Sequence, residues 1–253
     1  MDEKLDKIVK NTASKASFLI TLTGQGSKLE KSFVPEIAVT AGCHYEIAFA
    51  SLETYNSIPN INESNNTIQI SKLKMPWVPI SLDTGCYGLM DLNIEIGRKI
   101  KALGMDKAVE FKANYNTFRC IMYIRPGFAV NFSGGRSMNT VLGFEKKIYK
   151  TKDQRVRYVS EHIVRIMMVN SILVHCDLVG ASYLNGVRVP VIHSFFPLAD
   201  PGDKIVERPT EYIYLPISSD VIRHMSVWLT DQDQNLLDLR EETLTIKFHL
   251  RSC

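Results

Sequence analysis

Residues 243–251 read TLTIKFHLR, and this short stretch decides the fold class. Leu244, Ile246, Phe248 and Leu250 alternate with polar residues, a period of two. In a β-strand that period places the apolar side chains on one face and the polar ones on the other. The segment is therefore predicted to be an antiparallel strand with one buried face and one face in water.

The same alternation recurs along most of the chain and predicts about eight main strands. They are expected near 17–23, 45–53, 66–72, 164–178, 188–196, 210–217, 224–231 and 243–250. Turn-forming sequences separate them, as at 56–60 and 199–203. Many strands divided by turns are typical of a β-sandwich or a barrel. The predicted class is mainly β.

The stretch 83–146 departs from this pattern. Apolar residues recur there at helical spacing: Leu89, Leu92, Ile96, Ile100 and Leu103. Gly104 follows at a position suited to end a helix. Short alternating runs come next, near 109–111, 119–124 and 128–132, and Ser137 begins a turn that ends at Gly143. We predict a small α+β insertion between the third and fourth strands of the sandwich.

Composition limits the domain organisation and the class of partner. The chain has 253 residues, of which 45% are hydrophobic, enough for one large β domain or two small ones. The net charge is +3, and the first seventeen residues mix acidic and basic side chains. Because nucleic-acid binders usually carry a basic stripe, no specific nucleic-acid partner is expected.

The five cysteines favour free thiols in a reducing compartment. They lie far apart in the sequence, at Cys43, Cys86, Cys120, Cys176 and Cys253. None forms a CxxC pair of the kind that binds zinc or does redox chemistry. The chain also has no apolar run long enough to span a membrane and no N-terminal signal-peptide pattern. Neither a membrane-spanning segment nor a signal peptide is therefore expected.

One motif suggests catalysis. Asp83-Thr84-Gly85 follows an apolar run, as in aspartic proteases, where two aspartates share one proton. A single copy would serve only in a dimer, and Cys86 stands where a small residue is expected. The competing interpretation is a structural loop that leads into the helix at Leu89, and we prefer it.

No other pattern forms a complete site. The six histidines lack the His-x-His pair of cupin-type metal enzymes, and His249 is expected to face solvent on the last strand. His193, beside two phenylalanines, is expected to be a packed histidine and not a metal ligand. Residues 134–136 lack the Gly-Lys-Ser/Thr of a phosphate-binding loop, and 231–235 lack the glycine and distal glutamate of a calcium loop. We therefore predict no catalytic, cofactor-binding or metal-binding residue and no cofactor.

The C-terminal half resembles the penton, or minor capsid, proteins of Polinton/Maverick-type viruses and adintoviruses. The motifs that carry the resemblance lie in order along the chain: Ala181-Ser182-Tyr183, Asn185-Gly186, Val191 to Pro197, Pro201-Gly202, Lys204 to Glu207 and Asp231-Gln232-Asp233. Gln234 stands where the family has a glycine. Further upstream, TGCYGLMDLNIEI at 84–96 and VLGF at 141–144 are similar to family motifs, so the resemblance covers roughly 40–251.

The resemblance implies a single jelly roll, homopentamers at icosahedral vertices and contact with a double-jelly-roll major capsid protein. It implies a virion protein, assembled inside the host cell in the nucleus or the cytoplasm. It also puts Asp83 in a structural loop. Two alternatives stay open: a carbohydrate- or receptor-binding, lectin-like jelly roll, and the dimeric aspartic protease.

The predicted organisation is an N-terminal arm at 1–16 and a jelly-roll domain at 17–253 with the insertion at about 83–146. The arm could order on assembly, form a marginal helix around Leu5, Ile8 and Val9, or stay disordered. Aromatic residues in predicted loops are candidates for interfaces, although most could be ordinary core residues. They are Tyr55, Trp77, Tyr87, Phe144, Tyr183 and Tyr212.

Overall fold

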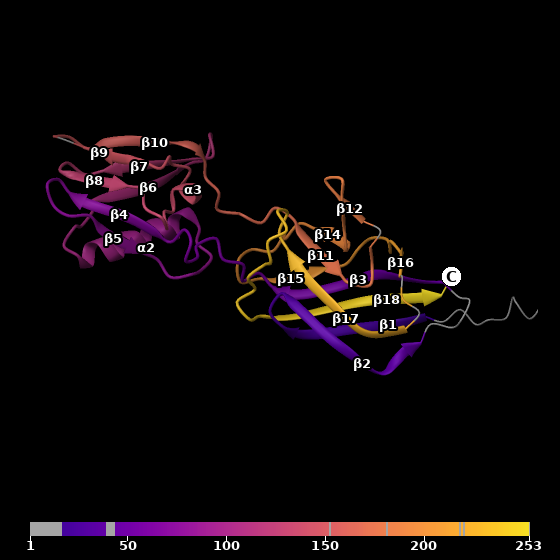
Figure 1. Cartoon of the computed structure of the whole chain (residues 1–253). Coiled ribbons are helices and arrows are strands. Elements are labelled where there is room, and N and C mark those ends of the chain that lie inside the picture. Colours follow the sequence, from indigo (N-terminus) through magenta and orange to yellow (C-terminus); the bar gives the residue numbers. More distant parts are fainter. Residues whose placement is uncertain are drawn as a thin grey trace, which may run out of the picture. The chain divides into compact units, whose positions relative to one another are not determined.

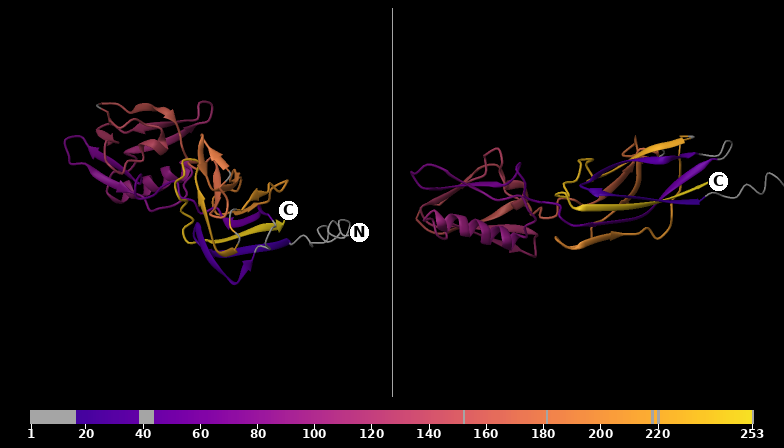
Figure 2. Two further views of the ribbon diagram at one scale, coloured as in Figure 1. Left: turned by 45° about the vertical axis from the view of Figure 1, so that its right-hand side comes forward. Right: turned by 90° about the horizontal axis from the view of Figure 1, so that it is seen from below.

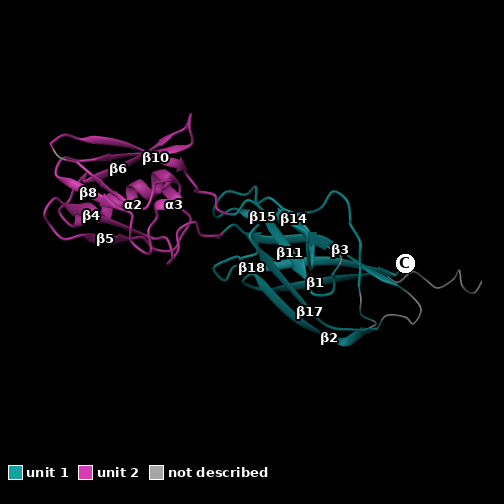
Figure 3. Ribbon diagram, turned by 45° about the horizontal axis from the view of Figure 1, so that its top comes forward, with its two compact units in different colours: residues 1–56, 169–253 teal, residues 57–168 magenta. Residues whose placement is uncertain are grey.

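The computed structural model describes residues 17–38, 44–151, 153–180, 182–217, 219 and 221–252. The predicted arm at 1–16 lies outside the described residues. The chain is mainly β and divides into two compact units (Figure 3). The first combines the described residues up to Asn56 with those from Val169 onward, and the second spans Ser57–Met168.

The first unit is a sandwich of two antiparallel sheets (Figure 1). One sheet has the order β1 (Ser17–Gln25), β18 (Thr243–Ser252), β3 (Tyr45–Tyr55) and β15 (Lys204–Glu207), with the short β16 (Leu215–Pro216) also paired to β3. The other has the order β14 (Val191–Phe195), β11 (Ile172–Cys176), β17 (Val221–Thr230) and β2 (Lys28–Ala38). A small hairpin, β12 (Ser182–Leu184) and β13 (Val187–Val189), turns at Asn185-Gly186.

The connectivity of these strands is that of a jelly roll. With the two-residue β16 and the β12–β13 hairpin left out, eight strands remain in the described part of the sandwich. Counted along the chain, the first, third, sixth and eighth form one sheet, and the other four form its partner. The chain therefore passes repeatedly between the two sheets, as interlocked Greek keys require. Figure 2 shows β18 between β1 and β3 from two further sides.

Strand β18 buries one face, as its alternation predicted, and lies between two other strands of its sheet. On β18, Leu244, Ile246, Phe248 and Leu250 are fully buried, while the residues between them are exposed or half-buried. Phe248 pairs with Phe49 of β3, and their rings meet edge to face at 6.3 Å. Burying one such ring contributes roughly 1.5–3 kcal/mol.

The second unit contains two smaller antiparallel sheets and two helices. One sheet has the order β5 (Val78–Ser81), β4 (Thr67–Lys72), β8 (Phe128–Asn131) and β9 (Ile148–Lys150). The other has the order β10 (Val156–Ile163), β7 (Arg119–Ile124) and β6 (Val109–Asn114). The helices are α2 (Leu89–Ala102) and the short α3 (Asn139–Leu142).

Helix α2 begins and ends where the sequence predicted. The backbone N–H of Gly88 donates to the Asp91 carboxylate at 2.9 Å, and Gly104 follows the last turn with a φ of +73°. Leu92, Ile96 and Ile100 form its buried face and join the core of this unit. The helix therefore packs through one apolar stripe.

Several predicted strands differ from the observed ones. The strand near 66–72 exists as β4, but it pairs with β5 and β8 in the second unit and not within the sandwich. The second unit thus runs from 57 to 168, and the predicted bounds of 83–146 fall inside it. Strand β11 starts only at Ile172, and the region 210–217 keeps only the two residues of β16. Strand β2 was missed because most of its side chains are exposed, so its sequence does not alternate.

Candidate functional site

The Asp83-Thr84-Gly85 loop is a structural connection in the second unit. The backbone groups of Gly85 and Ile61 exchange hydrogen bonds at 2.9 and 3.1 Å, and the Asp83 carbonyl accepts the Tyr87 hydroxyl at 3.0 Å. The Asp83 side chain is exposed. The loop connects β5 to α2 through these contacts.

The histidines of the first unit bond mostly to hydroxyls and carboxylates. Buried His175 bonds through Nε2 to the Thr230 hydroxyl at 2.8 Å and stacks on Trp228. His249 was expected to face solvent, but it lies half-buried between the hydroxyls of Ser17 and Tyr214, each at 2.6 Å. Edge strand β1 and the segment before β16 both bring hydroxyls to β18, which the alternation alone did not reveal.

Among the described residues, no group of three or more His, Cys, Asp and Glu side chains could hold a metal ion. Nor does the described part of the chain contain a helix of the length and apolarity that a bilayer crossing requires.

One flank of the sandwich has a hydrogen-bonded side-chain pair beside a cavity. It consists of the edge strands β14 and β15 and the segment 208–214, and we call it the β14–β15 flank. His193 on β14 stacks on Phe49 at 4.3 Å and bonds to the Glu207 carboxylate on β15 at 2.9 Å. His193 is thus packed, as expected, although its side chain is still 18% exposed at the flank. A cavity of about 420 Å³ opens beside the pair.

The β14–β15 flank exposes apolar side chains. Val206, Tyr212 and Ile213 are all at least half exposed, and Ile213 is 70% exposed. Apolar side chains gathered on one surface commonly form protein interfaces. Among the strands that the structure describes, none pairs with the outer edge of β15.

The opposite flank consists of β1 and β2, the other two edge strands, and we call it the β1–β2 flank. Phe18, Leu19 and Val34 are exposed there, Val34 at 95%. Pro35 on β2 has no N–H to donate, which weakens this strand as a template for unspecific pairing. The two flanks expose different side chains, so each presents a different surface.

The six aromatic residues considered as interface candidates divide into two groups. Tyr55, Tyr183 and Tyr212 are exposed in the first unit. Phe144 is buried, and Trp77 and Tyr87 are half-buried in the second unit. Tyr212 alone lies on the β14–β15 flank.

No protein-family model matches the chain, and no curated protein matches it by sequence. One similar solved structure is the crystal structure of the selenomethionine-labelled mavirus penton protein. The TM-score is 0.51 and the sequence identity 10%, over 95% of this chain and 100% of that chain. The chain therefore has a penton-like, mainly β fold. Because the identity is so low, the likeness concerns the fold alone.

Proposed function

We propose that the chain is a structural minor capsid protein, a penton, that forms homopentamers at the vertices of an icosahedral virion. The observation that carries the proposal is the fold shared with a viral penton protein over nearly the whole length of both chains. The order of motifs between about 40 and 251 that resembles Polinton/Maverick-type and adintovirus pentons supports it independently. The role proposed is structural and includes no enzymatic activity.

The two flanks support a ring. A closed ring of identical subunits needs a heterologous contact, in which two different surfaces of each subunit meet. The β14–β15 flank and the β1–β2 flank lie at the two ends of the strand orders and expose different apolar side chains. We propose that they meet between neighbouring subunits and bury on the order of 1,000 Å² per contact, as stable interfaces do.

The proposed partners and location follow from the same role. A vertex protein must contact the shell around it, and we propose that this shell is built from a double-jelly-roll major capsid protein. The protein would then belong to the virion and be assembled inside the host cell, in the nucleus or the cytoplasm.

Native mass spectrometry and light scattering test the ring at high protein concentration, first alone and then with the major capsid protein of the same virus. The expected mass is that of five chains, alone or in the mixture. A stable dimer or trimer under both conditions would contradict the proposal, and a lectin-like role would replace it.

Two flank variants test the heterologous contact directly. Ile213→Asp alters the β14–β15 flank and Leu19→Asp alters the β1–β2 flank, and each is expected to block ring closure. When the two variants are mixed, the intact β1–β2 flank of Ile213→Asp can bind the intact β14–β15 flank of Leu19→Asp. The mixture should therefore contain a dimer of one chain of each variant. Met90→Asp is the matched control, because Met90 is exposed on α2 in the second unit. Dimers of either variant alone, with none added by mixing, would contradict a heterologous ring.

A further inference from the structure

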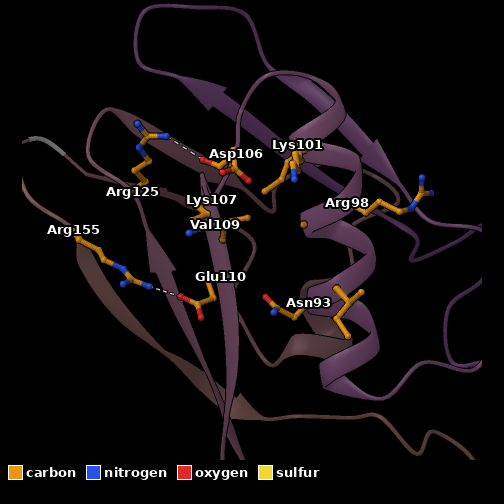
Figure 4. Close-up of a pocket in the computed structure, with 12 residues that line it drawn as sticks. Asn93, Arg98, Lys101, Asp106, Lys107, Val109, Glu110, Arg125 and Arg155 are labelled. Atoms are coloured by element: carbon orange, nitrogen blue, oxygen red, sulfur yellow. Dashed lines mark hydrogen bonds and ion pairs between the residues drawn. The ribbon is translucent and has the colours of Figure 1, made fainter.

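The second unit contains a groove of about 800 Å³ between helix α2 and strand β6 (Figure 4). The helix contributes Ile94, Gly97 and Lys101 to its lining, and the turn and strand that follow contribute Lys107 and Val109. Its size is in the range of ligand-binding sites. The assembly proposal does not involve this groove.

The groove has an excess of positive charge. Five basic side chains line it, Arg98, Lys101, Lys107, Arg125 and Arg155, against the acidic Asp106 and Glu110.

Only some of these cations have acidic partners. Arg155 pairs with Glu110, and Arg98 pairs with Glu95 on its own helix. Within the described ranges, Lys101 and Lys107 have no ion-pair partner, and Arg125 donates to the backbone carbonyl of Asp106 at 3.0 Å. The remaining cations therefore favour an anionic occupant.

Gly97 keeps the helix side of the groove open. A glycine in a helix interior costs roughly 1 kcal/mol relative to alanine. Yet a Cβ at Gly97 would meet no atom within 4 Å, so no close packing requires the glycine. One turn away, Ile94 is 60% exposed, while Ile100 and Val109 are buried at the base. The groove thus combines an apolar wall with a charged end.

The outer edge of strand β6 is largely covered. Among the described strands it is the last of its sheet, and the bond from Arg125 N–H to the Ala108 carbonyl fixes its register with β7. In that register the backbone groups of Val109 and Phe111 face away from β7. The Phe111 N–H donates to the Asn93 side chain at 2.7 Å, Val109 is only 4% exposed, and Lys107, with a φ of +54°, belongs to the preceding turn. An occupant of the groove would therefore be held by side chains and not by the strand edge.

We propose that this groove binds a short acidic segment of a partner protein. The segment would lay an apolar side chain against Ile94 and Gly97 and direct carboxylates to Lys101, Lys107 and Arg125. No aromatic ring lines the groove, so it lacks a platform on which a sugar would stack. A small inorganic anion would use the charges and leave the apolar wall unused.

The test measures binding of the full-length protein to a library of eight-residue, end-capped peptides that alternate apolar and acidic residues. Matched libraries carry Gln or Lys in place of the acidic residues, and inorganic sulfate is a separate probe. We expect selective binding of acidic peptides that weakens with added salt. Gly97→Met should fill the groove and reduce affinity about tenfold or more, and Lys101→Gln should reduce it by about fivefold.

Two controls separate lost binding from lost folding. Lys99→Gln removes the same charge from the same helix outside the groove and should leave binding unchanged. Gly97→Met replaces a glycine with a better helix former, so its melting temperature should not fall.

Three outcomes would overturn the proposal. They are no acidic peptide bound above the Gln library, binding that survives Gly97→Met, or sulfate competing at concentrations as low as the peptides do.

Discussion

His193 on β14 donates its Nε2 hydrogen to the Glu207 carboxylate on β15, 2.9 Å away, and so ties together the edges of the two sheets. The imidazole also stacks on Phe49 of β3 with its centroid at 4.3 Å. A single side chain thus connects three strands at the β14–β15 flank. These contacts fix the positions of β14 and β15 in the isolated chain, before any partner binds.

Replacing His193 with alanine is expected to lower the free energy of unfolding by about 1–2 kcal/mol. It removes one hydrogen bond to a charged group and two ring contacts, with Phe49 and Phe195. Urea unfolding at neutral pH measures the change. The control is His224→Ala, since the His224 side chain is 74% exposed and its nearest carboxylate oxygen, on Asp177, lies 3.8 Å away. The control should change stability by less than about 0.5 kcal/mol; equal losses would show that the His193 contacts contribute nothing.

Gly143→Ala is expected to destabilise the second unit far more than Gly104→Ala. Both glycines follow a helix with a positive φ, +77° and +73°. A Cβ at Gly143 would lie 2.4 Å from the His162 carbonyl oxygen, whereas at Gly104 it would meet nothing within 4 Å. Each substitution has the cost of a left-handed alanine, about 1–2 kcal/mol. Gly143→Ala adds a backbone collision, which costs about 1–3 kcal/mol more.

Thermal unfolding of the two alanine variants, side by side, measures this difference. The comparison cancels the conformational cost that both share and isolates the collision with β10. Similar melting temperatures for both variants would show that the contact at His162 relaxes without cost. A lower melting temperature for Gly143→Ala than for Gly104→Ala would explain physically why a glycine stands inside the VLGF motif.

The sequence predicted the elements that bury a regular stripe and missed those that do not. Strand β18 and helix α2 were located almost to the residue, because each packs one face against a core. Strand β2 is an exposed edge, and β15 has only four residues. Neither has enough buried side chains to impose a period on the sequence.

The pairing between strands was harder to predict than the positions of the strands. The run 66–72 was recognised as a strand, but its alternation does not specify which strands it pairs with. The groove between α2 and β6 was missed for a related reason. Its cations come from the helix, the following turn, the end of β7 and the segment before β10, so no single stretch of the sequence contains them all. Gly97, inside a predicted helix, and the basic residues at 98, 99 and 101 were the local signals available.

Cys120 and Cys176 are expected to resist alkylation until the protein unfolds. Both thiols are buried on strands, Cys120 in the second unit and Cys176 in the first, and burial raises the pKa of each to about 12. At pH 8 almost no thiolate forms, and the thiolate is the species that reacts. Cys86 is only half-buried and provides the comparison.

Iodoacetamide labelling at pH 8, followed by peptide mass mapping, checks this prediction with and without urea. Cys120 and Cys176 should label only in urea, and Cys86 should label earlier. Rapid labelling of Cys176 in the native protein would show that the sandwich opens near β11.

The last prediction concerns the buried histidine of the sandwich. The Thr230 hydroxyl donates to the Asp231 carbonyl at 3.1 Å, so it must accept the Nε2 hydrogen of His175. The Nδ1 atom of His175 is buried and, among the described residues, has no hydrogen-bond partner. Protonation would place a charge there without an acceptor, and burial accordingly lowers the pKa of His175.

The sign of the pH dependence follows from this lowered pKa. Between the folded pKa and the unfolded value near 6.5, the unfolded chain binds more protons than the folded one. The stability linked to His175 is therefore complete above pH 6.5 and is lost as the pH falls from there through the folded pKa. His175→Phe keeps a ring against Trp228 and removes the titrating group. Urea unfolding at intervals from pH 8 to pH 5 should give a steeper loss of stability for the wild type than for the variant. Parallel curves would show that His175 takes up its proton in the folded sandwich as readily as in the unfolded chain.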